Sequence, residues 1–497
     1  MTTVNSSAAA DDAEVPRSEA DPRRWLVLAL LSGLQFMILL DMTAVNVALP
    51  QIQTGLGFSA AGLAWVVNGY VLAAGGLLML GGRLADVFGR RRLLVTGVVV
   101  FAVSSAVSGA AVDPWMMIVG RVGQGTAEAL AAPASLGLIA LLFSDPKERT
   151  KALGIWGGII GLGSTVGSVV SGLLTDLASW RWIFFINLPV AVLVLVLVPR
   201  LVTESRMVRE KDQAPDILGG LTLTLGLTGV VYGLLHAADH SWGSTTVVVP
   251  LVAGVALLVA MLLIERRARN PLIPLGFFAN RTRSVVNVAT LFFMAAFISY
   301  SFMLTLFEQQ VLDYSPLVSG LAWLPLSVAI GAGMGLGTAL IPRLGIRTVA
   351  AIGYIGAGVG LFITSMIDVD STYLGGILPG MAVFGLFAGA SMPAATNAAL
   401  HGVTVQDSSL ASGVQSTMQQ IGSALGVAIL VALAIRHAGD AIGSGTRPDV
   451  ATTDGYGLAI RIGGALIVVG GILLAALLEK VDTKLRDPMA ERLADAR

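Results

Sequence analysis

The 497-residue chain has no cysteine, few charged residues and few aromatic ones. Without cysteine it forms no disulfide, no thiolate nucleophile and no cysteine-ligated metal site. Charged residues make up 12% of the chain, against roughly 25% in soluble domains, which excludes an ordinary soluble enzyme. The 31 basic residues balance the 31 acidic ones, so no net field attracts a polyanion, and no nucleic-acid partner is predicted.

The sequence also lacks a motif for ATP or for catalysis. A phosphate-binding loop needs Gly-Lys-Ser/Thr, and none of the five lysines follows a glycine. His236 and His240, with Asp239 between them, only loosely resemble a metal-site spacing, in a stretch where a polar loop is expected anyway. The loops are short and hold no cluster of His, Ser and Asp, so neither an enzyme nor a sensor is favoured. We predict no metal and no cofactor.

Apolar sequence dominates what is present. Hydrophobic residues make up 55% of the chain, glycine adds 59 residues, and the mean hydropathy is +0.81. A membrane helix needs about 20 mostly apolar residues, and fourteen runs of that kind predict an all-α integral membrane protein. The runs are Trp25–Pro50, Ala60–Leu80, Leu93–Ala111, Trp115–Phe143, Ala152–Thr175, Trp182–Val198, Ile217–His236, Val247–Ile264, Ser284–Phe307, Leu317–Leu340, Thr348–Met366, Leu374–Leu400, Gly413–Ile435 and Leu458–Leu478.

The positions of the basic residues give the orientation. If the N-terminus is cytoplasmic, 26 of the 31 lysines and arginines fall in cytoplasmic segments, as the positive-inside rule requires. A miscounted span would destroy this asymmetry, so both termini are predicted to be cytoplasmic. Residues 1–22 are polar, small and acidic, and predict a disordered cytoplasmic tail. Residues 479–497 form the second predicted tail.

Three charged residues fall inside predicted spans, where charge is costly and usually functional. At about 1.5 Å per residue, Asp41 lies ~24 Å above Trp25, in the outer part of the membrane. The fourth span enters from outside, which puts Arg121 ~9 Å and Glu128 ~20 Å below Trp115. Asp41 and Arg121 therefore share a depth and are predicted to pair if the first and fourth spans pack together.

The sequence leaves two interpretations of this pair. It is either a structural clamp or a proton switch, in which Arg121 holds Asp41 ionised and protonation of Asp41 changes the local charge balance. Glu128 lies two helical turns from Arg121, on the same face of the span. Burial favours the neutral form of a carboxyl, so Glu128 is either a proton carrier near neutral pH or a water-exposed wall residue of a cavity.

Several motifs carry a family resemblance. The loop after the second span reads GRLADVFGRRR, in which Gly82 and Gly89 permit close backbone approach. Asp86 can pair with Arg90 or Arg91, or cap the next helix. This loop resembles the signature loop of the major facilitator superfamily. A degenerate echo, GTALIPRLGIR at Gly337–Arg347, lacks the Asp and suggests an internal repeat.

Further segments are similar to one branch of that superfamily, the fourteen-helix drug:proton antiporters. They are LDMTAVNVALP (Leu40–Pro50), RVGQG (Arg121–Gly125) with Pro133, SWRWIFFINLP (Ser179–Pro189), Tyr314–Pro316 with Pro325, and Gln419–Gly426. The resemblance covers nearly the whole chain after residue 23. It implies two six-helix bundles, residues 23–200 and 284–478, with two extra helices in a linker at 201–283.

The resemblance also implies a function. It predicts proton-driven efflux of drugs or secondary metabolites by alternating access, with proton coupling at Asp41, Arg121 and Glu128. The conformational-switch loop would comprise Gly82, Asp86, Gly89, Arg90 and Arg91. The expected partners are protons, the bilayer and a lipophilic small molecule, with a cation favoured by the buried carboxylates and neutral compounds left open. Arginine exceeds lysine 26 to 5, which indicates a GC-rich bacterial genome. We expect a monomer in the bacterial cell membrane.

The substrate site is expected near the membrane midplane, between the two bundles. The candidates that line it are Gln35 and Glu128 from the first half, and Gln415 and Gln419 from the second. The last two are four residues apart and share a helix face, but interhelical hydrogen bonding explains them equally well.

One departure from the branch matters. Its fifth span normally contains Gly-Pro-x-x-Gly-Gly, and here Gly167–Gly172 reads GSVVSG. Proton-coupled uptake of a small organic solute therefore stays open as the alternative function.

Overall fold

The computed structural model describes residues 23–479, except 144, 205–215, 239, 269–271, 273–274 and 400–407. The two predicted tails, 1–22 and 479–497, therefore lie outside the described residues, apart from Glu479. The described residues are helical almost throughout and contain no strand.

The chain builds two halves joined by a helix pair. The first half comprises α1 (Arg24–Leu56), α2 (Ala60–Phe88), α3 (Arg90–Gly109), α4 (Pro114–Leu142), α5 (Pro146–Leu177), α6 (Trp182–Phe185) and α7 (Asn187–Leu201). The connecting pair is α8 (Ile217–His236) and α9 (Thr245–Arg267), followed by a short 3₁₀ turn at Leu275–Ala279. The second half comprises α10 (Arg281–Gln310), α11 (Pro316–Ala322), α12 (Leu324–Thr364), a π turn at Tyr373–Ile377, α13 (Leu378–Ala399), α14 (Ser408–Gly443) and α15 (Pro448–Leu477).

These helices give the fourteen predicted spans. The backbone of α12 breaks at Gly345, where φ is 78° and ψ is 158°, so α12 supplies two spans. The short helices α6 and α11 lead directly into α7 and α12 and complete one span each. The boundaries differ from the prediction: α1 continues through Pro50 to Leu56, and α10 continues through Glu308 to Gln310. Both predicted spans ended too early, the first at Pro50 before the polar stretch that starts at Gln51, and the other just before the charged Glu308.

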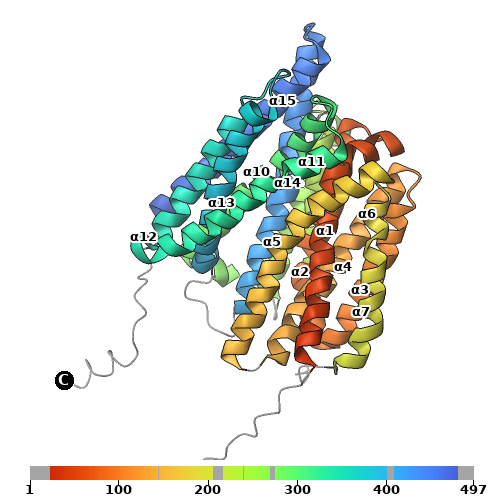
Figure 1. Ribbon diagram of the computed structural model, residues 1–497, viewed down its shortest axis with the longest axis vertical. Helices are drawn as coiled ribbons and strands as arrows, with labels where there is room; N and C mark the ends of the chain where they lie inside the picture. The colour runs from red at the N-terminus through yellow and green to blue at the C-terminus, as the bar shows by residue number, and fades with distance from the viewer. Residues whose placement is uncertain are drawn as a thin grey trace, which may run out of the picture.

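The halves stand side by side, with α1–α7 on one side and α12 and α13 on the other (Figure 1). The chain enters and leaves at the same end, the lower end of Figure 1, which we call the terminal end. The opposite end, where α11 lies against α5, is the distal end (Figure 1). An even number of spans requires this arrangement of the two termini.

The outer surface is apolar, as a bilayer requires. Helix α9 packs on α8 through close backbone contact of Gly254 with Gly226 and Gly229. Its other faces expose large apolar side chains, among them Val249, Val252, Val255, Val259, Leu262 and Leu263. Water would penalise such a surface heavily, whereas hydrocarbon does not. The protein is therefore a multi-pass membrane protein.

The two halves pack along α2 and α14, and at the distal end they also share side-chain hydrogen bonds. The side-chain amide of Gln309 on α10 donates to the backbone oxygen of Val47 on α1 at 2.7 Å, and its oxygen accepts from Gln51 at 2.9 Å. Gln310 donates to Gln53 at 2.9 Å. We call these three hydrogen bonds the glutamine seal.

Beside the glutamine seal, α5 and α11 approach each other at backbone distance. A Cβ on Gly172 would meet the backbone of Pro316, and one on Gly320 would meet the carbonyl of Ser168. The contact between the halves therefore combines exchangeable amide hydrogen bonds with two glycines that leave the helix surfaces smooth.

Packing inside a half should tolerate no added atom. A methyl group on Gly337 of α12 would overlap the carbonyl of Ala390 on α13, whereas one on Gly335, on the exposed face of the same helix, meets nothing. We expect Gly337→Ala to destabilise the protein by about 1–3 kcal/mol through overpacking. The matched control, Gly335→Ala, should be neutral or slightly stabilising. Thermal unfolding of the purified protein in detergent measures both, and equal melting temperatures for the two variants would contradict the packing of α12 on α13.

Candidate functional site

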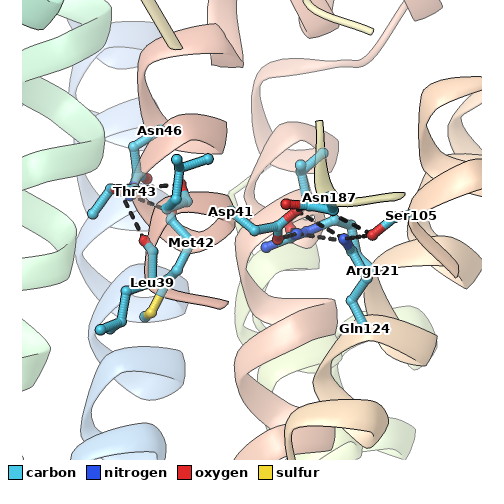
Figure 2. Close-up of polar contacts among 11 residues, drawn as sticks. Leu39, Asp41, Met42, Thr43, Asn46, Ser105, Arg121, Gln124 and Asn187 are labelled. Carbon is cyan, nitrogen blue, oxygen red and sulfur yellow. Dashed lines mark hydrogen bonds and ion pairs between the residues drawn. The ribbon is translucent and has the colours of Figure 1, made fainter. Parts of the chain in front are cut away.

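A fully buried carboxylate lies at the centre of the first half. Asp41 on α1 has no exposed surface. Its Oδ2 accepts from Arg121 of α4 at 2.6 Å, and its Oδ1 accepts at 2.8 Å from both Gln124 and Asn187. Figure 2 shows these side chains converging on Asp41 from α4 and α7, with Ser105 of α3 on the right, on the side away from Asp41. The predicted Asp41–Arg121 pair is therefore confirmed, and the equal depth of the two residues explains it.

Arg121, like Asp41, makes several hydrogen bonds. Besides Asp41, its guanidinium donates to the backbone oxygen of Val66 on α2 at 2.9 Å and to the side chain of Gln124 at 2.7 Å. The ring of Tyr70 lies 4.5 Å from the guanidinium carbon. A planar guanidinium presents its donors in a fixed fork that matches these acceptors, whereas a lysine ammonium is a compact point charge on a flexible stem. The ion pair thus ties α1, α2 and α4 together.

Three residues of this network were missing from the sequence-based site. Ser105, Gln124 and Asn187 are buried and complete the hydrogen bonding around Asp41. Gln124 and Asn187 lie in motifs that carried the family resemblance, but neutral amides in a helix gave no reason to assign them a role. Their depth in the membrane could have identified them, because Gln124 and Asn187 fall in the same layer as Asp41.

Glu128, two turns along α4, is placed differently. Its Oε2 is buried and has no hydrogen-bond partner among the described residues, and the same holds for the hydroxyl of Tyr70. Tyr70 faces Glu128 and also lies over Arg121, so its ring stands between the two charged side chains. Asp41 is saturated by donors, whereas Glu128 keeps a free oxygen. The side chain as a whole is half-buried. A carboxyl with an unpaired oxygen can take up a proton without losing an ion pair.

The switch loop fixes the terminal end of the first half. Gly89 adopts φ 104°, which favours glycine, and lets α3 start directly after α2. Asp86 accepts from Arg90 at 3.0 Å, and Arg90 also donates to the carbonyl of Gly137 on α4 at 2.9 Å. Arg91 donates to the carbonyl of Val202 after α7 at 3.1 Å. The loop therefore connects α2 and α3 to α4 and to the end of α7.

The second half repeats this turn with different chemistry. Gly345, like Gly89, has a positive φ (78°) followed by an extended ψ. Two residues on, Arg347 donates through Nε to the carbonyl of Ala475 on α15 at 2.7 Å. Pro342 and Ile341 occupy the region where the first loop has Asp86, so no ion pair can form there. The positive φ at matching places supports the internal repeat.

The predicted substrate-site glutamines are not gathered by hydrogen bonds. Gln35, Gln415 and Gln419 are half-buried, and no hydrogen bond between described side chains joins them to one another or to Glu128. The neighbouring Gln420 packs against Gly75, where α14 crosses α2. Their predicted role in a substrate cavity remains a prediction.

Two further features bear on the sequence analysis. The rings of His236 and His240 lie 6.0 Å apart at the end of α8, and Asp239 lies outside the described residues. Among the residues that the structure describes, no group of three potential metal ligands is found. Glu308 on α10 has no exposed surface, although the predicted span ended one residue before it.

A membrane protein built from two repeated helical halves, with a buried acid–base network in one of them, has the architecture of a secondary transporter. The sequence pattern of the Major Facilitator Superfamily matches residues 31–427, and the chain belongs to that family.

Relatives with named activities cover most of the chain. The puromycin resistance protein pur8 of Streptomyces alboniger is 39% identical over 489 residues, 96% of this chain and 94% of the relative. The lincomycin resistance protein of Streptomyces lincolnensis is 37% identical over 426 residues, 86% of each chain. A crystal structure of a bacterial homologue of the human lysosomal transporter Spinster, inward-facing and unoccupied, matches with a TM-score of 0.64 at 14% identity. It covers 91% of this chain and 96% of its own, and supports the fold.

The buried pair should show itself in a stability cycle. Asp41→Leu and Arg121→Leu each leave one charge buried without its partner, which should cost about 3–5 kcal/mol. The double variant leaves neither charge and should be more stable than either single variant. Thermal unfolding in detergent measures the cycle, with Asp449→Asn as the control because its ion pair with Arg447 is exposed and should matter little. Additive losses in the double variant would show that the two residues do not stabilise each other.

Proposed function

We propose that this protein exports antibiotics or other secondary metabolites from a bacterial cell in exchange for protons. The observation that carries the proposal is the buried Asp41–Arg121 pair with the unpaired Glu128 two turns below it. Charged groups at such depth are rarely kept for stability alone. The resistance and export names of relatives that span nearly the whole chain support the direction of transport.

Proton coupling divides between the two carboxyls. Asp41 keeps its ion pair and accepts hydrogen bonds from Arg121, Gln124 and Asn187. Glu128 takes the proton, because its Oε2 has no hydrogen-bond partner among the described residues, and the ring of Tyr70 lies over the guanidinium of Arg121. A substrate cation competes with this proton for Glu128. Proton and substrate therefore occupy the site in turn, which is the requirement for antiport.

The proton gradient supplies enough free energy for useful efflux. One charge crossing 100 mV is worth about 2.3 kcal/mol. One pH unit adds about 1.4 kcal/mol per proton. Since each ~1.4 kcal/mol corresponds to a tenfold ratio, one proton can support an accumulation of roughly 100-fold.

Substrate class and placement complete the proposal. The substrate is a lipophilic small molecule, with cations favoured, bound between the halves near Gln35, Glu128, Gln415 and Gln419. The chain is a monomer in the bacterial cell membrane, with the terminal end in the cytoplasm. The arginines of the switch loop (Arg83, Arg90, Arg91 and Arg92) and Arg343 support this orientation, because they come at turns on the terminal end. In this proposal the first six-helix bundle comprises residues 23–200, the linker with the two extra helices comprises 201–283, and the second bundle comprises 284–478.

Inside-out vesicles test the antiport directly. An acid interior is imposed and followed with a pH dye while puromycin, lincomycin and lipophilic cations are added in turn. In the wild type, at least one compound should dissipate the gradient. Glu128→Gln should abolish this response, because a neutral amide cannot exchange a proton. Ser105→Ala removes a neutral member of the network and should keep most of the response.

Two outcomes would redirect the proposal. If Glu128→Gln and Asp41→Asn both exchange protons as the wild type does, the buried network is structural and coupling lies elsewhere. If no compound dissipates the gradient, solute uptake into right-side-out vesicles is measured. Substrate accumulation there would establish the alternative function, proton-coupled uptake, which the altered fifth span leaves open.

The switch loop should affect rate rather than binding. Asp86→Asn removes the ion pair with Arg90, which steadies the terminal end of α2 against α4. We expect turnover to fall roughly tenfold, equivalent to about 1.4 kcal/mol in the barrier, with drug binding unchanged. Asp113→Asn, at the N-cap of α4 at the distal end, keeps its cap and serves as the control. Transport rates and binding by fluorescence quenching measure the two effects, and equal losses in both would contradict a role in switching.

A further inference from the structure

Glu308 is a buried acid that neither the sequence analysis nor the proposed coupling uses. It lies in the last turn of α10 and has no exposed surface. Both of its carboxylate oxygens lack a hydrogen-bond partner among the described residues, and no ion pair within the described chain includes it. This contrasts with Asp41, which accepts from three side chains.

The surroundings of Glu308 supply donors but no cation. The hydroxyl of Ser319 on α11 and the indole N–H of Trp323 face the carboxyl, yet neither closes a hydrogen bond with it. The titratable groups that face it are the phenols of Tyr300 on α10, Tyr314 in the loop that follows, and Tyr373 before α13. All three phenols are neutral over the ordinary pH range.

The position of Glu308 connects it to the contact between the halves. The next two residues, Gln309 and Gln310, make the glutamine seal with α1. Ser319, which faces the carboxyl, precedes Gly320, whose backbone touches Ser168 on α5. The α1 and α5 residues at this contact are neutral. Any movement that hydrates Glu308 must therefore shift the two segments that hold the distal end closed.

The cost of burying Glu308 depends on whether its carboxyl is protonated. An ionised carboxylate buried without a cation costs several kcal/mol, whereas the protonated acid is neutral and can donate a hydrogen bond. The closed distal end consequently favours protonated Glu308. An open distal end admits water and favours the ionised form. By linkage, protonation must favour closure by the same free energy.

We propose that Glu308 is a proton-operated latch of the distal end: its protonation closes the two halves over α1 and α5, and its ionisation releases them. Glu308 is not the proton carrier of antiport. It lies beside the distal contact, so its proton arrives from the distal side and returns there. The latch rests on the alternating access proposed above, but it concerns conformation and not transport.

The absence of natural cysteine allows a direct measurement. Val112, in the loop before α4, and Val318, on α11, are exposed at the distal end of opposite halves. Val112→Cys and Val318→Cys in one chain accept a pair of spin labels, and pulsed electron resonance in lipid nanodiscs reads their separation. In the wild type, the long-distance population should rise as the pH increases from 5 to 9. Glu308→Gln, a mimic of the protonated acid, should keep the short distance at every pH.

Two controls separate the latch from other carboxyls. Glu265→Gln removes a buried carboxyl on α9, at the terminal end, and should keep the wild-type response. Glu128→Gln, which removes the proposed coupling carboxyl, should also keep the distal response even though antiport is lost. Loss of the response in Glu128→Gln, with Glu308→Gln unaffected, would place the pH sensor at Glu128 and overturn the latch.

The remaining outcomes are equally decisive. A wild type whose separation ignores pH, or a Glu308→Gln variant that follows the wild type, would overturn the proposal. If Glu308→Gln fails to fold, Glu308→Asp replaces it. The shorter acid withdraws from Ser319 and Trp323, so its pH response should persist with a displaced midpoint. An unchanged midpoint in Glu308→Asp would overturn the latch.

Discussion

The cost of burying charge in an apolar helix bundle governs the first half of this protein. Asp41 and Arg121 have almost no exposed surface, and each would be costly alone. Their pairing requires α1 and α4 to pack at one register, the carbonyl of Val66 brings α2 to the same point, and Asn187 brings α7. A shift of α1 or α4 by one residue would leave a buried charge without its partner, and a shift of α2 or α7 would remove a hydrogen bond from the pair. The network therefore determines the packing as much as the apolar side chains do.

The two halves share a topology but differ in how they treat a buried acid. Gly89 and Gly345 give both halves the same turn, yet only the first has an Asp–Arg pair beside it. Likewise Asp41 accepts hydrogen bonds on both carboxylate oxygens, whereas neither oxygen of Glu308 has a hydrogen-bond partner among the described residues. A satisfied network resists change, and an unsatisfied one changes its preferred environment with a single proton. The two halves therefore share a turn but surround their buried acids differently: Asp41 is held by donors on neighbouring helices, and Glu308 is not.

The sequence predicted the fold well because lipid leaves few choices. In a bilayer every backbone group must be paired within the span, so each apolar run has to be a helix. Equal depth then sufficed to pair Asp41 with Arg121. The neutral partners Gln124 and Asn187 were not predictable in the same way, since an amide is tolerated at many helix positions. Glu308 was missed because it follows the apolar run at its edge, where a charge is taken as the end of a span, whereas α10 continues to Gln310 and buries the acid. Which residues meet across the two halves depends on their relative tilt, and no periodicity in one chain encodes that.

Contacts within a half and between the halves differ in strength. Inside the first half, Gly81 and Gly125 bring α2 and α4 to backbone contact, which leaves no room for a shift. Between the halves, the glutamine seal consists of three neutral hydrogen bonds, each worth about 1 kcal/mol net. One proton crossing 100 mV releases about 2.3 kcal/mol, and a pH unit adds about 1.4 kcal/mol. The free energy of a single proton therefore matches that of the seal, while the glycine-packed interior lies beyond its reach. The halves also pack where α14 crosses α2 at Gly75, so the seal is only the hydrogen-bonded part of the contact between them.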